Sequence, residues 1–227
     1  MFPIRDTQPS YSKPYVTILL IVINMLIFLY EFSLSPYSRD HFIATYGMVP
    51  DEFSFFTLLT SMFLHGGWMH VLGNMWFLWI FGDNIEDTLG HGKYLLFYIA
   101  CGMIAGLAQF IVNPTSRVPT VGASGAIAGV LGGYLVLYPT SRIGTLIGLG
   151  FIYFPARIYA WAFIVFWFLL QLVNGVASIG TNASAGGGVA YWAHVGGFLT
   201  GVVLVRLFAH PARVQQLAEL EAQPSPA

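Results

Sequence analysis

GASGAIAGVLGGYLVLY, at residues 122–138, is an uncharged apolar segment in which glycine recurs at every fourth position, at Gly125, Gly129 and Gly133. Small residues at this spacing form a helix face on which a second transmembrane helix can pack closely. From Ser124 onward the segment has 15 residues, or about 22 Å of helix, which is shorter than the roughly 30 Å hydrocarbon core. We therefore expect a short central membrane helix whose first residue, Ser124, lies below the membrane surface, as a packing contact or as a nucleophile.

The composition places this helix in an integral membrane protein. Of the 227 residues, 56% are hydrophobic and 8% are charged, and the mean hydropathy is +0.70. Soluble domains typically carry about 25% charged residues. The net charge of −1 argues against nucleic acid as a partner. The single cysteine, Cys101, excludes an intramolecular disulfide, so helix packing must hold the fold together.

Six segments approach the roughly 20 apolar residues that a membrane-spanning helix needs. They are residues 15–32, 68–82, 94–112, 123–138, 158–177 and 191–209. Two shorter apolar pieces, 53–64 and 143–154, are expected to lie at the interface or to re-enter the membrane. The predicted fold class is an all-α membrane protein built as a six-transmembrane-helix bundle with a short central fourth helix. A seventh span is the weaker alternative.

Charges in the loops predict the orientation of this bundle. With six spans, seven Lys and Arg residues lie on one side and two, Arg39 and Arg117, on the other. The positive-inside rule then places both termini in the cytoplasm. We expect a cytoplasmic N-terminal segment at 1–14, the membrane domain at 15–210 and a cytoplasmic tail at 211–227. Because the N-terminus lacks the features of a targeting peptide, a bacterial or archaeal cytoplasmic membrane is expected, with a eukaryotic organelle as the alternative.

In this topology the second, fourth and sixth helices all enter from the outer face. His70 and Asn74 lie near the start of the second, Ser124 at the start of the fourth and His194 near the start of the sixth, so all four share one depth. His70 and Asn74 are four residues apart and therefore share a helix face. A nucleophilic serine needs a base and hydrogen-bond donors for the oxyanion, and these residue types supply both. The alternative is interhelical hydrogen bonding without chemistry.

Packing between the fourth and sixth helices could bring the serine and the histidine together. Ala193, Gly197 and Gly201 repeat on the sixth helix the small-residue spacing of the fourth. If the two faces pack on each other, Ser124 and His194 come within hydrogen-bonding range. Such faces are also common in ordinary membrane helices, where they mark packing alone.

Three motifs carry a resemblance to a known family: HGGWMHVLGNMWFLWIFG at 65–82, GASGAIAGVLGGY at 122–134 and AHVGGFLTG at 193–201. Their order on alternate helices resembles the rhomboid family of intramembrane serine proteases, over about residues 47–208. The resemblance implies a rhomboid-like bundle with Ser124 as nucleophile and His194 as general base and acid, a dyad without an acidic third member. It further implies that His70, Asn74 and the backbone N–H of Ser124 hold the oxyanion.

The same resemblance implies that the partners are transmembrane protein substrates within the lipid bilayer, cut near the membrane surface without a metal or cofactor. Two departures stand out. Family members often carry an aromatic residue four positions after the serine that stacks on the histidine, and here that position is Ala128. The segment 33–56 also contains no tryptophan, whereas many members carry a Trp-Arg pair in the first outer loop.

Other functions and sites fit the sequence less well. A rhomboid-like pseudoprotease would bind transmembrane clients without cutting them, but inactive relatives typically lack the serine or the histidine. A transporter or channel would place its polar residues near the midplane rather than near one face. His65 and His70 are five apart, off the spacing of helical metal pairs, so no zinc site is expected. The aromatic residues of the fifth helix indicate a lipid-facing surface or a lateral gate, and Glu86 is expected to cap or bridge helices.

Overall fold

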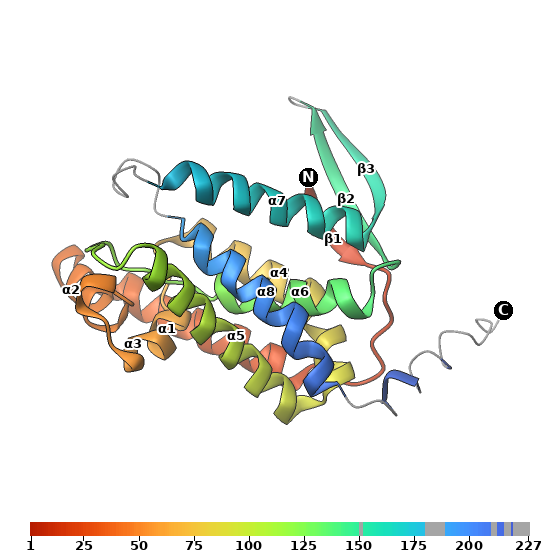
Figure 1. The fold of residues 1–227 in the computed structure, drawn as a ribbon, viewed down its shortest axis with the longest axis horizontal. Helices are drawn as coiled ribbons and strands as arrows, with labels where there is room; N and C mark the ends of the chain where they lie inside the picture. The colour runs from red at the N-terminus through yellow and green to blue at the C-terminus, as the bar shows by residue number, and fades with distance from the viewer. Residues whose placement is uncertain (150–151, 180–188, 210–212, 216–218, 220–227) are drawn as a thin grey trace.

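The computed structural model describes residues 1–149, 152–179, 189–209, 213–215 and 219. The chain forms a bundle of long helices with a small antiparallel sheet at one end (Figure 1), which confirms the expected all-α membrane fold. The long helices are α1 (Tyr15–Ser33), α4 (Trp68–Leu89), α5 (His91–Val112), α6 (Ser124–Leu137), α7 (Ala160–Ser178) and α8 (Tyr191–Phe208). Each begins within three residues of its predicted start, but α4 continues seven residues beyond the predicted 82.

Four helices in the described part of the chain, α1, α5, α7 and α8, are long and apolar enough to cross a membrane. The central helix α6 is apolar but has only 14 residues, about 21 Å of helix. Helix α4 has 22 residues and carries three carboxylates near its end, Asp83, Glu86 and Asp87. The six-span topology therefore stays a prediction for α4 and α6.

Short elements complete the end of the bundle at which α6 and α8 begin, here called the Ser124 end. They are α2 (Pro36–Tyr46), η1 (Pro50–Glu52), α3 (Phe55–Thr60) and η2 (Ser61–Phe63). Ser35 caps α2 by accepting a hydrogen bond from the Ser38 N–H, and Pro36 occupies the first helical position. The stretch 175–190, whose glycines Gly186, Gly187 and Gly188 suggest either a lid or a plain connector, begins within the last turn of α7, and its residues 180–188 lie outside the described residues.

Glycine lets α6 sit at the centre of the bundle, between α5 and α8. A Cβ on Gly197 of α8 would collide with the Gly125 carbonyl of α6, and one on Gly201 would collide with the Gly129 carbonyl. On its other side, a Cβ at Gly125 would lie 2.6 Å from Ala105 Cβ of α5. The two helices that start with Ser124 and Tyr191 are thus in backbone contact, as helices joined by small residues are. Further along α6, away from Ser124, Gly133 packs against Val205 of α8 and Phe97 of α5.

A three-stranded antiparallel sheet lies at the opposite end, here called the sheet end. It has the order β1 (Phe2–Asp6), β2 (Arg142–Leu149) and β3 (Ile152–Tyr159). The piece 143–154, expected to be interfacial or re-entrant, instead contributes its residues 143–149 and 152–154 to two paired strands, which stand away from the bundle beside the start of α7 (Figure 1). The N-terminal segment supplies the third strand, which Trp76 and Tyr134 hold on the bundle by donating hydrogen bonds to the Pro3 carbonyl (2.7 Å) and to Asp6 (2.5 Å).

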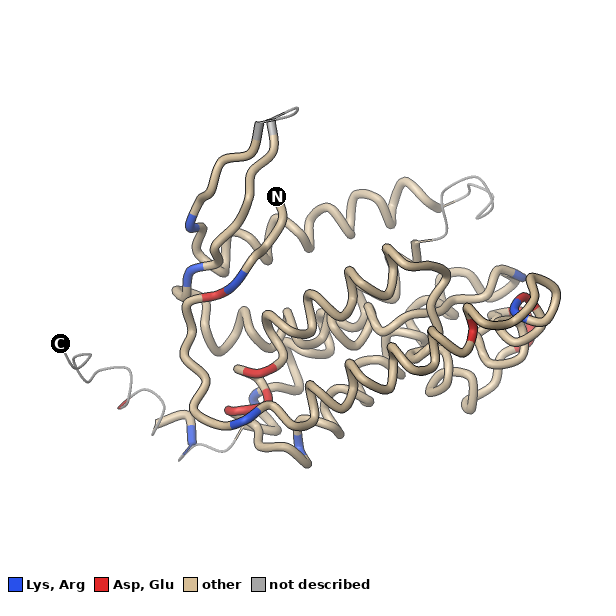
Figure 2. Tube along the Cα trace, turned by 180° about the vertical axis from the view of Figure 1, so that it is seen from behind, with Lys and Arg blue, Asp and Glu red and all other residues tan. Residues whose placement is uncertain are grey.

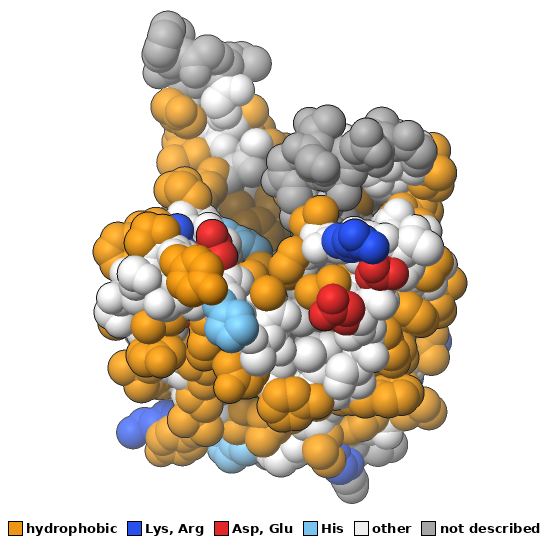
Figure 3. Space-filling view, turned by 90° about the vertical axis from the view of Figure 1, so that its left-hand side faces the viewer, with side chains coloured by type: hydrophobic (Ala, Val, Ile, Leu, Met, Phe, Trp, Pro, Cys, Tyr) orange, Lys and Arg blue, Asp and Glu red, His pale blue; other side chains and the backbone are white. Residues whose placement is uncertain are grey.

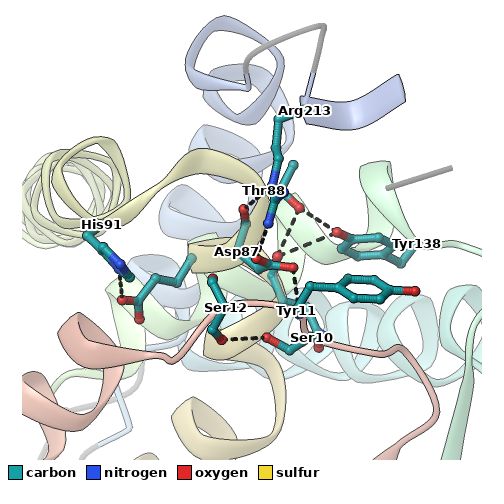
Figure 4. Close-up of polar contacts among 10 residues, drawn as sticks. Ser10, Tyr11, Ser12, Asp87, Thr88, His91, Tyr138 and Arg213 are labelled. Carbon is teal, nitrogen blue, oxygen red and sulfur yellow. Dashed lines mark hydrogen bonds and ion pairs between the residues drawn. The ribbon is translucent and has the colours of Figure 1, made fainter. Parts of the chain in front are cut away.

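Carboxylates tie the chain together at the sheet end, where α4 meets α1 and α5. The fully buried Glu86 accepts from the N–H groups of Val16 and Thr17, each at 2.8 Å, and so caps the start of α1. It also contacts His91 Nδ1 at 2.6 Å, which confirms the expected capping and bridging role. Its neighbour Asp87 pairs with Arg213 at 2.6 Å and accepts from the Tyr11 N–H at 3.0 Å (Figure 4).

Candidate active site

Ser124 is the first residue of α6, and Gly122 shapes the turn before it. Gly122 has φ +122°, a conformation that residues with a side chain rarely adopt. Its N–H donates to the Ser61 carbonyl at 2.9 Å. A Cβ at this position would lie 2.6 Å from His70 Nε2 and 3.5 Å from Asn74 Nδ2. The backbone just before the serine therefore passes directly against the two predicted oxyanion donors of α4.

His194 lies in the first turn of α8, opposite the serine. Its Nε2 is 2.7 Å from Ser124 Oγ, which is hydrogen-bonding distance. The backbones of α6 and α8 are also in contact beside this pair, where Gly197, three residues after His194, packs on the carbonyl of Gly125, the residue after Ser124. The two predicted catalytic side chains thus meet in the structure, both of them partly buried.

Two residues of α7, neither of them predicted, hold the other side of the histidine ring. His194 Nδ1 is 2.9 Å from Gln171 Oε1. The Trp167 ring lies against the imidazole with a centroid distance of 5.9 Å and an interplanar angle of 35°. Ala128, the position at which relatives often carry an aromatic residue, is buried in the core of α6. The aromatic contacts of His194 therefore come from Trp167 of α7 and, edge-on at 6.5 Å, from Tyr191 of α8, and not from α6.

The sequence contained a signal for Gln171. It is the one amide or charged side chain between residues 160 and 173, and polar residues in apolar membrane segments are functional candidates by default. Trp167 precedes it by four positions, so the two share a face. Trp167 was among the aromatic residues expected to face lipid or to form a gate, and it instead contacts the candidate site.

A second polar layer lies behind Asn74. Asn74 Nδ2 is 2.9 Å from His65 Nε2, and the His65 ring is 5.1 Å from the His70 ring. The His65 backbone N–H donates to Glu31 Oε2 of α1 at 3.2 Å. His65 and Glu31 are 1% and 0% exposed. The contact with His65 holds the Asn74 side chain in place, and with Asn74 Nδ2 as the donor the accepting His65 Nε2 is the unprotonated ring nitrogen.

The Ser124 end carries little charge around this site. Figure 3 looks onto this end of the bundle, where few charged side chains lie among hydrophobic and uncharged ones. Among the described residues of its loops, Arg117 forms an ion pair with Asp51 at 3.0 Å. A pocket of about 20 Å³ lined by Ser61, Gly122 and Ser124 adjoins the serine, and about one water fits such a volume. Within the described residues, no three His, Cys, Asp or Glu side chains are grouped to hold a metal ion.

Comparison with known proteins adds a family likeness to this geometry. A family model described as the Rhomboid domain matches residues 52–211. The chain is 33% identical over 136 residues to the rhomboid protease GluP of Bacillus subtilis (strain 168), spanning 58% of this chain and 26% of GluP. The chain therefore spans about a quarter of the length of that relative.

Two further relatives are matched over more of their length. The putative rhomboid protease YdcA of Bacillus subtilis (strain 168) is 34% identical over 150 residues, 63% of this chain and 74% of YdcA. The chloroplastic rhomboid-like protein 11 of Arabidopsis thaliana is 29% identical over 198 residues, 82% of this chain and 66% of that protein. Because similar proteins include a chloroplastic one, the comparisons do not support the expectation of a bacterial or archaeal membrane.

Proposed function

This chain belongs to the rhomboid family, and on that premise we propose that it is an intramembrane serine endopeptidase that cuts other membrane proteins in or near their transmembrane segments. The observation that carries the proposal is the 2.7 Å contact between Ser124 Oγ and His194 Nε2. A serine at this distance from a base is the arrangement that nucleophilic acyl transfer requires. A protein that only binds transmembrane helices has no need for that contact.

Each group then has a role in the reaction. Ser124 Oγ attacks the scissile carbonyl carbon while His194 Nε2 takes its proton. The tetrahedral intermediate collapses as the imidazolium gives that proton to the departing amine, leaving an acyl-enzyme on Ser124. A water molecule, deprotonated by His194, attacks the acyl carbon, and the proton returns to Ser124 Oγ as the acid product leaves.

The oxyanion that forms in both halves of this reaction needs donors already in position. His70 and Asn74 lie against Gly122, two residues before the serine. Together with the Ser124 N–H they surround the place where a carbonyl oxygen would project beside Ser124 Oγ. The N–H of Ser124 is available because it belongs to the first residue of α6, where no preceding turn accepts its hydrogen bond.

The length of α6 supports hydrolysis inside a bilayer. At about 21 Å the 14-residue helix is shorter than the hydrocarbon core and cannot reach both membrane surfaces, and we place the resulting gap above Ser124, where hydrolysis needs water. We also propose that the chain spans the membrane six times with both termini on the cytoplasmic side, because Lys and Arg are concentrated in the loops on that side. The substrates are then transmembrane helices that reach Ser124 from within the membrane.

Cleavage by purified protein in liposomes tests this function. A panel of single-span reporter proteins, each with a fluorophore at one end, should be cut by wild type, and Ser124→Ala or His194→Ala should reduce the rate by at least about 10³-fold. A fluorophosphonate probe should label the wild type at Ser124. Reporter cleavage that proceeds at the wild-type rate in the Ser124→Ala protein would exclude the proposal. Binding of reporters with neither cleavage nor probe labelling would identify a pseudoprotease instead.

A further inference from the structure

The orientation of the Gln171 amide is decided by its two neighbours on α7 and α8. Gln171 Nε2 donates to the Trp167 carbonyl at 3.2 Å, and the Gln171 side chain is 9% exposed. An amide nitrogen donates and an amide oxygen accepts. With Nε2 committed to the carbonyl, it is Oε1 that faces His194 Nδ1 at 2.9 Å.

That orientation selects one tautomer of His194. An amide oxygen can only accept, so Nδ1 must carry the ring proton. The neutral ring then has no proton on Nε2, which lies 2.7 Å from Ser124 Oγ. This is the form in which His194 can take the serine proton, whereas the other tautomer would present a donor to the hydroxyl.

We propose that Gln171 is a positioning residue of the site, a third member that α7 adds to the Ser124–His194 pair, with the Trp167 ring holding the imidazole plane. The inference rests on the proposed function and extends it. Gln171 touches no substrate atom and acts through His194. Because α7 supplies both supports, a displacement of α7 that breaks the Gln171 contact also removes what sets the histidine tautomer, so the position of this helix is coupled to catalysis.

The kinetics of Gln171 variants test this role. Gln171→Leu should lower kcat at least about 10-fold and leave KM within about twofold, because general-base efficiency is lost but substrate contacts are not. Gln171→Glu retains an acceptor for Nδ1–H and should recover most of kcat. Its carboxylate also favours the protonated imidazole, so the acid limb of the rate should move to higher pH by about one unit.

Asn174→Leu is the matched control, since it removes an exposed amide from the same helix and should leave kcat and the pH profile unchanged. The rate of fluorophosphonate labelling gives a second readout that is independent of substrate. A Gln171→Leu protein that melts like wild type and keeps the wild-type kcat, or a Gln171→Glu protein whose acid limb does not move, would overturn the role of Gln171. Failure of the function itself would differ, because wild type would then cleave nothing.

A separate observation concerns the sheet, whose strands carry three arginines, Arg5, Arg142 and Arg157, at neighbouring points of the chain trace (Figure 2). The strand register aligns Arg5 of β1 with Gly144 of β2, and Gly144 with Arg157 of β3. Residues paired across antiparallel strands point to the same face. Arg5 and Arg157 therefore flank a position without a side chain. Arg142, two residues before Gly144, lies 4.7 Å over the Tyr159 ring.

The gap above Gly144 is an open cleft of about 280 Å³, lined by Arg5, Arg157, Gly144 and Thr145 among others. Neither Arg5 nor Arg157 forms an ion pair with a described residue. Asp6 points to the opposite face of the sheet, where Tyr134 donates to it. A neighbouring cleft beyond β1 contains Asp6 and Asp83 and is also lined by Arg5, whereas Arg157 faces the first cleft alone.

We infer that this cleft binds the phosphate of an anionic phospholipid. Guanidinium groups are suited to bidentate contact with phosphate oxygens. The cleft lies at the sheet end, where the chain passes from α6 to α7, and Tyr153 and Tyr159 are 64% and 44% exposed on the same hairpin. Aromatic and basic residues together are typical of segments at the headgroup level of a membrane. The occupant is thus a lipid headgroup of the leaflet that the hairpin contacts.

Thermal unfolding in neutral detergent with added lipid tests this site. Phosphatidylglycerol should raise the Tm of wild type by several degrees more than phosphatidylcholine does. Arg157→Gln should remove at least half of that excess and Arg5→Gln/Arg157→Gln nearly all of it. Gly144→Leu, which fills the cleft but keeps both charges, should do the same. Arg39→Gln/Arg117→Gln, at the Ser124 end, is the control and should keep the full shift.

The remaining outcomes decide the source of the phosphate. An equal Tm shift with inorganic phosphate at the same concentration would assign the cleft to a free anion and overturn the lipid proposal. A phosphatidylglycerol shift that survives in both the double arginine variant and Gly144→Leu would place lipid binding elsewhere. Reporter cleavage is not needed for either result, so this test is independent of the proposed protease activity.

Discussion

At the scale of single residues, Gly122 links the serine to its surroundings. Its positive φ turns the chain into α6, and its missing side chain leaves room for His70. Gly122→Ala combines backbone strain with a Cβ 2.6 Å from His70 Nε2. We expect the variant to lose about 10²-fold or more in activity, since a displacement of about 1 Å near the reacting groups costs that much. Fluorophosphonate labelling rates measure the loss.

Gly73→Ala is the control for this prediction, because a Cβ at Gly73 of α4 would meet nothing within 4 Å. It should leave labelling unchanged and should even stabilise the helix slightly. Wild-type labelling of the Gly122→Ala protein would show that the turn before Ser124 tolerates a side chain and that the close approach to His70 is not required.

Residues also show where sequence reasoning succeeds and where it ends. His70, Asn74, Ser124 and His194 each stood out as polar groups near helix starts, and the structure brings them to one place. Gln171 carried the same polar signal but lies in the middle of α7. Its partner is 23 residues away in sequence on another helix, and the crossing of α7 and α8 that joins them leaves no local pattern.

At the scale of elements, the backbone contact between α6 and α8 sets the distance between Ser124 and His194. Gly201→Ala would drive a Cβ into the Gly129 carbonyl, a rigid backbone atom, so the two helices must separate. Overpacking of this kind typically costs about 1–3 kcal/mol. We expect a lower Tm in detergent and slower fluorophosphonate labelling, although Gly201 lies about two turns of α8 away from His194 and touches no reacting group.

Gly92→Ala, in the first turn of α5, provides a comparison because nothing lies within 4 Å of a Cβ there. It should leave both the Tm and labelling close to wild type. If Gly201→Ala behaves in the same way, the α6–α8 contact is looser than the structure indicates, and small residues on these faces are not what brings the serine and histidine together.

Strand β1 attaches to the bundle through a carboxylate whose titration should be measurable. Burial raises the pKa of Asp6 to about 6, although Tyr134 donates a hydrogen bond to it. A raised carboxyl pKa means that the folded state holds its proton more tightly than the unfolded state. The contribution of this group to stability is therefore largest below pH 3.8 and falls as the pH rises to about 6.

Asp6→Asn removes the charge and keeps an acceptor for the Tyr134 hydroxyl. The variant should melt at a higher temperature than wild type at pH 7, and the difference should shrink as the pH falls through the range from about 6 to 4. Melting curves in detergent at pH 4, 5, 6 and 7 check this. A constant difference over that range would show that another effect of the substitution, not the ionisation of Asp6, alters stability.

At the scale of the whole molecule, hydropathy was enough to place the helices but not the sheet. The six long helices begin close to their predicted positions because uninterrupted apolar runs leave few alternatives in a membrane. Residues 143–149 and 152–154 are equally apolar, yet they pair in β2 and β3, and the third strand comes from residues 2–6, more than 130 positions earlier. Pairing between segments so distant in sequence is not visible in a local pattern.

The arrangement of the molecule also predicts which surfaces a reagent can reach from each side of the membrane. Tyr37, in α2, is 85% exposed at the Ser124 end, and Tyr153, in β3, is 64% exposed at the sheet end. Cys101 is fully buried and is the chain's one cysteine, so the native protein should not react and cysteines introduced by Tyr37→Cys or Tyr153→Cys can be labelled selectively.

In sealed right-side-out vesicles, an impermeant maleimide should label the Tyr37→Cys protein and should reach the Tyr153→Cys protein only after permeabilisation. The wild type should stay unlabelled in both conditions. Equal labelling of both variants in sealed vesicles would place the two ends on one side, and the shared depth of Ser124, His194 and His70 would then need a different topology from six spans.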